Sequence, residues 1–121
     1  MILIVGSAGS GKRSFVRSLG YTDAQIADAE CSSLPVLAHL EQMVFADPDS
    51  ADRLLPLLLQ KEAVLCREVG SGVIPVDDAE RAGREATGRL CILLAQQAEC
   101  VIRMVCGIPT VIKGTLPGRS R

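Results

Sequence analysis

The first residues in the chain that suggest chemistry are a glycine-rich run, GSAGSGKRS, from Gly6 to Ser14. It fits the phosphate-binding pattern G-x-x-x-x-G-K at Gly6, Gly11 and Lys12. Glycines let backbone N–H groups turn toward phosphate oxygens, and a lysine at that place reaches the outer phosphates of a nucleotide. The run therefore predicts binding of ATP or GTP. The residues assigned to nucleotide binding are Gly6, Ser7, Ala8, Gly9, Ser10, Gly11, Lys12, Arg13 and Ser14.

Arg13 departs from this pattern, which has serine or threonine directly after the lysine. That hydroxyl normally coordinates Mg²⁺, and a guanidinium has no acceptor atom with which to replace it. Ser14 cannot simply substitute, because it lies about 100° further round a helix axis. Arg13 could instead give its charge directly to a phosphate. The sequence thus predicts nucleotide binding and argues against a working magnesium site.

Glu68 is the second candidate, in REVGSGVIP, directly after the expected strand Ala63–Arg67. In open α/β sheets the ligand binds beyond the carboxyl ends of the strands, where this glutamate is expected. A carboxylate there could bind magnesium through water, orient a hydroxyl or accept a proton. We therefore assign catalytic roles to Lys12 and Glu68, with an ordinary exposed loop acid as the alternative for Glu68.

The expected strands and helices alternate along the chain, and these elements must position the candidate residues. The pattern predicts a single α/β domain over residues 1–121, with helices on both faces of a mainly parallel sheet. A turn at Gly107–Pro109 leaves room for an antiparallel edge strand at the C-terminal end, and residues 114–121 are expected to fray. Pro56 is expected to kink or split its helix, and Asp77 or Asp78 to cap the last one. The expected strands are 1–5, 24–28, 63–67, 100–105 and 110–113, and the expected helices 12–19, 34–45, 51–60 and 77–99.

The composition argues against several classes of function. A net charge of −1 provides no basic field for nucleic acid or an anionic membrane, and only 2% of residues are aromatic, too few for a base-stacking platform. The aliphatic runs are far shorter than the ~18 residues of a membrane span. Five cysteines without a C-x-x-C pattern indicate free thiols in a reducing cytoplasm. A zinc site is not expected, because the single histidine has no cysteine at ligand spacing.

The motifs resemble those of the bifunctional adenosylcobinamide kinase/adenosylcobinamide-phosphate guanylyltransferase family of cobalamin biosynthesis. The similarity is carried by MILIVGSAGSGK, AVLCREVGSGVIP, ERAGREATGRL and VIRMVCGIPTVIK. The resemblance implies a P-loop NTPase-like three-layer fold and phosphoryl transfer from ATP or GTP to the aminopropanol hydroxyl of adenosylcobinamide, a corrinoid. It also implies GMP transfer through a guanylylated histidine, and assembly as a homo-oligomer.

Residues that match the family's motifs lie in three segments of the chain. They are Gly6, Ser10, Gly11 and Lys12 in the loop, Glu68, Val69 and Gly70 in the second motif, and, in part, Arg81, Arg84, Gly88 and Arg89 in a helix. Three positions depart from the family: Arg13 replaces a magnesium-binding serine, while Arg67 and Cys91 each replace an asparagine.

The middle of the chain is much shorter than in the family and lacks the segment that carries the guanylylated histidine. His39 has no H-x-x-H-R neighbourhood, so we do not assign it that role and expect it on a helix surface. Asp28 aligns loosely with the acidic strand end of the family's Asp-Cys motif, with Glu30 as the weaker alternative, and would be the magnesium partner. The sequence therefore predicts a shortened kinase without the guanylyltransferase half. The alternatives are a non-catalytic nucleotide-binding homologue, acting as a regulator or subunit, and a remnant whose loop binds nothing.

Overall fold

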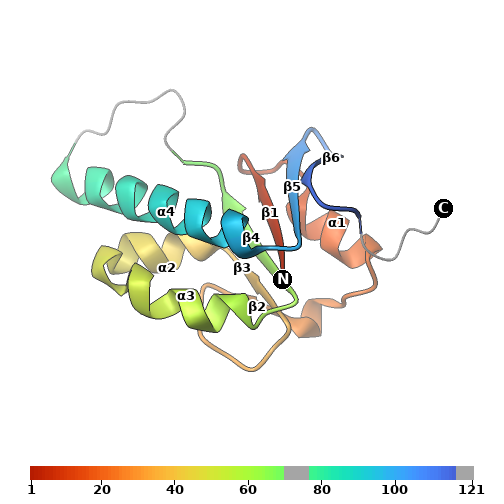
Figure 1. The fold of residues 1–121 in the computed structure, drawn as a ribbon, viewed down its shortest axis with the longest axis horizontal. Coiled ribbons are helices and arrows are strands. Elements are labelled where there is room, and N and C mark those ends of the chain that lie inside the picture. The colour runs from red at the N-terminus through yellow and green to blue at the C-terminus, as the bar shows by residue number, and fades with distance from the viewer. Residues whose placement is uncertain (70–76, 117–121) are drawn as a thin grey trace.

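A six-stranded sheet organises the fold, which is known from a computed structural model that describes residues 1–69 and 77–116 (Figure 1). The strand order is β2-β3-β4-β1-β5-β6, and every neighbouring pair is parallel except β5 and β6. This confirms the predicted α/β class, the mainly parallel sheet and the antiparallel C-terminal edge strand. The strands are β1 (Ile2–Gly6), β2 (Ile26–Asp28), β3 (Val36–Ala38), β4 (Ala63–Arg67), β5 (Cys100–Val105) and β6 (Ile108–Lys113).

Helices cover both faces of the sheet, as predicted. Helix α1 lies on one face, where Phe15 and Val16 pack against Ile4 and Ile102. The other three helices lie on the opposite face and pack against side chains such as Leu3 and those of β3 and β4 (Figure 1). None of the helices in the described part of the chain combines the length and apolarity that crossing a membrane requires. The helices are α1 (Lys12–Ser18), α2 (Leu40–Ala46), α3 (Ala51–Leu59) and α4 (Asp78–Gln97).

The central strand β1 places the glycine-rich run at the carboxyl edge of the sheet. It is hydrogen-bonded on both sides in parallel, to β4 and to β5, which explains its continuous apolar sequence. The register pairs Gly6 with Arg67 of β4 and with Met104 of β5. The three strands therefore end together, and the segments that follow them meet at one edge.

Residues 34–45 do not form the single helix that their pattern predicts. Val36–Ala38 are the buried strand β3, and α2 begins only at Leu40. His39 separates the two elements with left-handed backbone angles, φ 59° and ψ 42°. The predicted stripe on Leu37, Leu40 and Val44 is buried, but Leu37 is buried in the sheet. Because short apolar runs suit buried strands and helices equally, the periodicity could not distinguish them.

Helix α4 confirms the predicted cap and corrects one residue of its buried stripe. The Asp77 carboxylate accepts a hydrogen bond from the Glu80 amide at 2.7 Å. Ala86, Leu90 and Leu94 are buried as predicted, whereas Ala82 is exposed and Gly83 takes its place. A Cβ on Gly83 would lie 2.7 Å from the Phe45 ring, so the close approach of α2 to α4 requires a glycine there.

Of the two outcomes expected at Pro56, a kink or a split of the helix, the split does not occur. Helix α3 runs through Pro56, and Leu54 and Leu58 on either side of it are buried. Of the residues expected to fray, 114–116 are described, and Leu116 is half-buried against the cluster that includes Phe15. Residues 117–121 lie outside the described part of the chain.

Candidate functional site

The glycine-rich loop, residues 6–14, joins β1 to α1 at the carboxyl edge of the sheet (Figure 1). Gly9 and Gly11 have φ angles of 73° and 96°, a region in which other residues are strained. The Ser10 amide donates to the Ser7 carbonyl at 3.1 Å, and the Phe15 amide donates to the Gly11 carbonyl at 2.9 Å. The two glycines therefore allow the chain to turn from strand to helix, Gly11 at a position that the pattern specifies and Gly9 at one that it leaves open.

Neighbouring strands hold this loop in place. The Glu68 amide, after β4, donates to the Gly6 carbonyl at 2.9 Å, and the Gly107 amide, after β5, donates to the Ser10 carbonyl at 2.8 Å. A Cβ on Gly6 would lie 2.7 Å from the Met104 carbonyl oxygen. The loop is thus fixed by contacts from both sides of β1.

Lys12 folds its side chain back over the loop. Its Nζ donates to the carbonyls of Gly6 at 2.9 Å and Ser7 at 2.8 Å. Burial lowers the pKa of Lys12, and the negative charges of Glu41 and Glu68 partly oppose that shift. A partly desolvated ammonium in this place can donate the same hydrogen bonds to phosphate oxygens.

Ser10 is the buried polar residue of the loop, with 4% of its surface exposed. Its hydroxyl oxygen has no hydrogen-bond partner among the described residues, which is unusual for a buried polar group. Ser7, Ala8, Gly9 and Ser14 are exposed. The loop therefore carries unused hydrogen-bonding capacity beside Lys12.

A cavity of about 320 Å³ lies next to the loop. It is lined by residues 9–14 together with Ala38 at the end of β3, His39 directly after it and Leu65 in the middle of β4. This volume is at the lower end of the range for small-molecule sites. The cavity thus brings most of the predicted nucleotide-binding residues together.

Glu68 lies at the same edge, next to a partner that was not expected from the sequence. Arg103 of β5 binds it with two hydrogen bonds, Nε to Oε1 at 2.6 Å and Nη2 to Oε2 at 3.2 Å. Arg103 is the one charged residue in CVIRMV, exposed between buried Ile102 and Met104, and this break in the apolar run was the available signal. Val69 is half-buried, while Gly70 lies outside the described residues.

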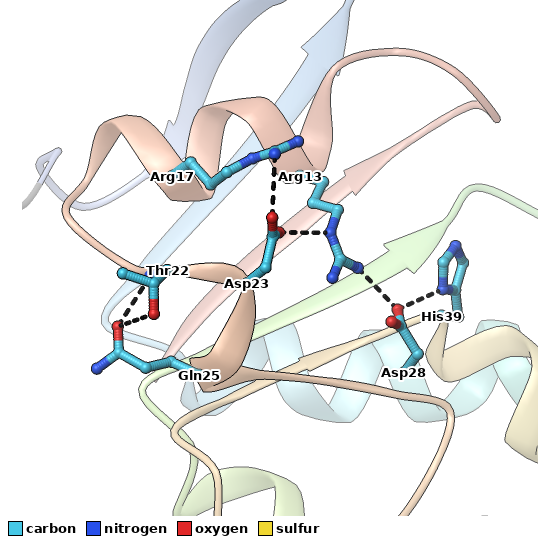
Figure 2. A network of polar contacts seen from close by, with 7 residues as sticks. All are labelled: Arg13, Arg17, Thr22, Asp23, Gln25, Asp28 and His39. Carbon is cyan, nitrogen blue, oxygen red and sulfur yellow. Dashed lines mark hydrogen bonds and ion pairs between the residues drawn. The ribbon is translucent and has the colours of Figure 1, made fainter.

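A network of ion pairs surrounds Arg13, as Figure 2 shows. Its Nη1 lies 2.8 Å from Asp28 Oδ1, and its Nε lies 3.1 Å from Asp23 Oδ1. Arg17, one turn later in α1, also contacts Asp23, at 3.3 Å. His39 Nδ1 lies 3.0 Å from Asp28 Oδ1, because β2 and β3 are neighbours and end side by side. His39 was expected on a helix surface and not in this site, so its contact with Asp28 could not be foreseen from the sequence.

The charge of Asp28 depends on these contacts. Burial on its own would raise the pKa of this carboxyl, but hydrogen bonds from Arg13 and His39 outweigh that effect and lower it. The carboxylate is thus held in its ionised form by the guanidinium beside it.

Titrating the Asp28 carboxyl by NMR is expected to give a midpoint below the ~3.9 of an unperturbed aspartate. In Arg13→Ser the midpoint should rise, because the largest favourable contact is gone. Since the folded-state pKa is the lower one, the Arg13–Asp28 pair contributes stability above the unfolded-state pKa and loses it as the pH falls through the folded-state value. An unchanged midpoint in Arg13→Ser would contradict this coupling.

The residues around Asp28 do not fit the Mg²⁺ ion that the resemblance implies. The guanidinium of Arg13 already lies against its Oδ1, and position 13 offers no oxygen ligand. The described residues contain no group of three histidine, cysteine or acidic side chains that could hold a metal ion. The Arg13 guanidinium thus lies against the Asp28 carboxylate, where a magnesium ion bound by Asp28 would have to lie.

The helix residues that match the family do not reach this site. Arg81 and Arg84 pair with Asp78 and Glu80 of their own helix, each at 3.6 Å. Together with Gly88 and Arg89, they do not line the cavity beside the loop in the described part of the chain.

Comparison with known proteins adds no relative: no family model matches the sequence, and no curated protein matches it significantly.

Proposed function

We propose that the protein binds a nucleoside triphosphate, ATP or GTP, through residues 6–14. The observation that carries this proposal is the Lys12 ammonium, held by the Gly6 and Ser7 carbonyls beside a cavity of about 320 Å³. The same proposal includes the P-loop fold that the resemblance implies. The order of β1, glycine-rich loop and α1 supports it.

The first candidate use of the nucleotide is phosphoryl transfer to the hydroxyl of adenosylcobinamide, by a shortened kinase of the resembled family. Glu68 supports this use, because its carboxylate is held by Arg103 at the edge where the loop lies. A carboxylate fixed in this way can orient the hydroxyl or accept its proton. The acceptor is thus expected beside Glu68, with its hydroxyl toward the phosphate held by Lys12.

The second candidate is a non-catalytic nucleotide-binding protein that acts as a regulator or subunit. The contact between Arg13 and Asp28 favours it, because Asp28 is paired with a guanidinium and position 13 has no hydroxyl. Nucleotide binding is common to both candidates, and turnover separates them.

A product assay by mass spectrometry tests the kinase candidate. We expect a phosphorylated corrinoid from ATP or GTP and adenosylcobinamide, and at least ~100-fold less product with Glu68→Gln, the usual contribution of a general base. Glu99→Gln is the matched control, because Glu99 pairs with the N-terminal amine away from the loop. Nucleotide binding without product from the wild-type protein would favour the non-catalytic candidate instead.

A further inference from the structure

We propose that Arg13 is a built-in counter-ion for the phosphates, so that the protein binds its nucleotide without Mg²⁺. This inference rests on the proposed nucleotide binding and names the form of the ligand, a metal-free polyphosphate. A triphosphate brings several negative charges that some cation must offset. In this chain two cationic side chains, Lys12 and Arg13, line the same cavity.

The position of Arg13 suits this role. Its side chain is 33% exposed, and two of its three nitrogens are held by carboxylates, Nε by Asp23 and Nη1 by Asp28. The third nitrogen, Nη2, makes no hydrogen bond within residues 1–69 and 77–116. A planar guanidinium that is tethered on one side keeps N–H donors for phosphate oxygens on the other. Asp23 and Asp28 thus orient the Arg13 guanidinium beside the cavity that adjoins the glycine-rich loop.

The same arrangement disfavours a magnesium ion. An ion on Asp28 Oδ1 would either displace the guanidinium, which lies 2.8 Å from that oxygen, or share the oxygen with it. Two cations within ~4 Å repel each other strongly at a partly buried site. Lys12 adds a further positive charge at the same cavity.

Isothermal titration calorimetry on the full chain, with ATP and with GTP, tests this inference. We expect wild-type protein to bind equally well in excess EDTA and in excess MgCl₂. Arg13→Ser should bind roughly tenfold more weakly in EDTA, since one charged hydrogen bond is lost, and should recover affinity when Mg²⁺ is added. Arg17→Ser is the matched control, because Arg17 contacts the same Asp23 but does not line the cavity.

Asp28→Asn provides a second variant that keeps Arg13 and removes its anionic partner. We expect its affinity in EDTA to match or exceed that of the wild type, because Asp23 still holds the guanidinium and an anion that competes with the phosphates for it is gone. Weaker binding of this variant in MgCl₂ alone would identify Asp28 as a metal ligand and overturn the inference.

The wild-type result separates this inference from the proposed function. Binding that requires Mg²⁺ would overturn metal independence and leave nucleotide binding standing. Absence of binding in both EDTA and MgCl₂ would overturn both.

Discussion

Lys12→Ala is expected to weaken binding of ATP or GTP roughly 100-fold, which corresponds to about 3 kcal/mol for charged hydrogen bonds to phosphate. The Lys12 ammonium lies over the loop and has the Gly6 and Ser7 carbonyls as its partners in the free protein. A bound phosphate would offer oxygens that are better acceptors than those carbonyls, and alanine offers no donor at all. Calorimetric titration of wild type and variant measures the difference.

Lys61→Ala is a matched control for this result. Lys61 also donates from Nζ to two backbone carbonyls, those of Ser32 and Leu34. It lies at the opposite edge of the sheet, where β3 and β4 begin. We expect Lys61→Ala to lower stability but to leave nucleotide affinity intact. Equal affinity of wild type and Lys12→Ala would show that the glycine-rich loop is not a phosphate site.

Gly6→Ala is expected to cost about 1–3 kcal/mol of unfolding free energy, the usual penalty for overpacking a buried site. The added Cβ would meet the Ser10 hydroxyl and lie 2.7 Å from the Met104 carbonyl oxygen. The hydroxyl can rotate away, but the carbonyl belongs to β5 and can move only with its strand. We therefore expect the loop to shift and nucleotide affinity to fall as well. Chemical denaturation and calorimetry measure the two effects.

Gly88→Ala is the control for Gly6→Ala. It tests whether the loss of unfolding free energy comes from the packing around Gly6 and not from the exchange of glycine for alanine in general. Gly88 lies in α4, and a Cβ there would meet nothing within 4 Å. Because no atom of the described residues opposes the added methyl group, we expect this variant to be more stable than wild type by about 1 kcal/mol, since alanine is the better helix former. If Gly6→Ala were as stable as the wild type, the packing of β1 against β5 would have to be looser than described.

Strong local signals made most of the sheet predictable. Ala63–Arg67 and Cys100–Val105 are strands at the residues expected from their apolar runs, and Asp77 caps α4 through the mechanism that its side chain implies. Strand β3 was missed because its boundary depends on His39, a residue that seldom adopts left-handed angles. A glycine at that position would have indicated the break.

The candidate site could be predicted only in part, for a similar reason. Residues 6–14 form a continuous motif, so their loop could be recognised locally. The Arg13–Asp28 and Glu68–Arg103 pairs join residues 15 and 35 positions apart, and only the strand order brings them together. The sequence showed that position 13 was unusual, but not that two carboxylates hold its guanidinium.

The hydrogen bond from the Gly107 amide to the Ser10 carbonyl has a consequence for how the protein folds during its synthesis. The ribosome makes the loop well before the turn that supports it, because Ser10 precedes Gly107 by 97 positions in the sequence. A nascent chain that ends before β5 lacks both the strand beside β1 and this contact. Because long-range pairing of this kind forms late, the glycine-rich loop takes its final shape only after β5 and the turn at Gly107 have been synthesised.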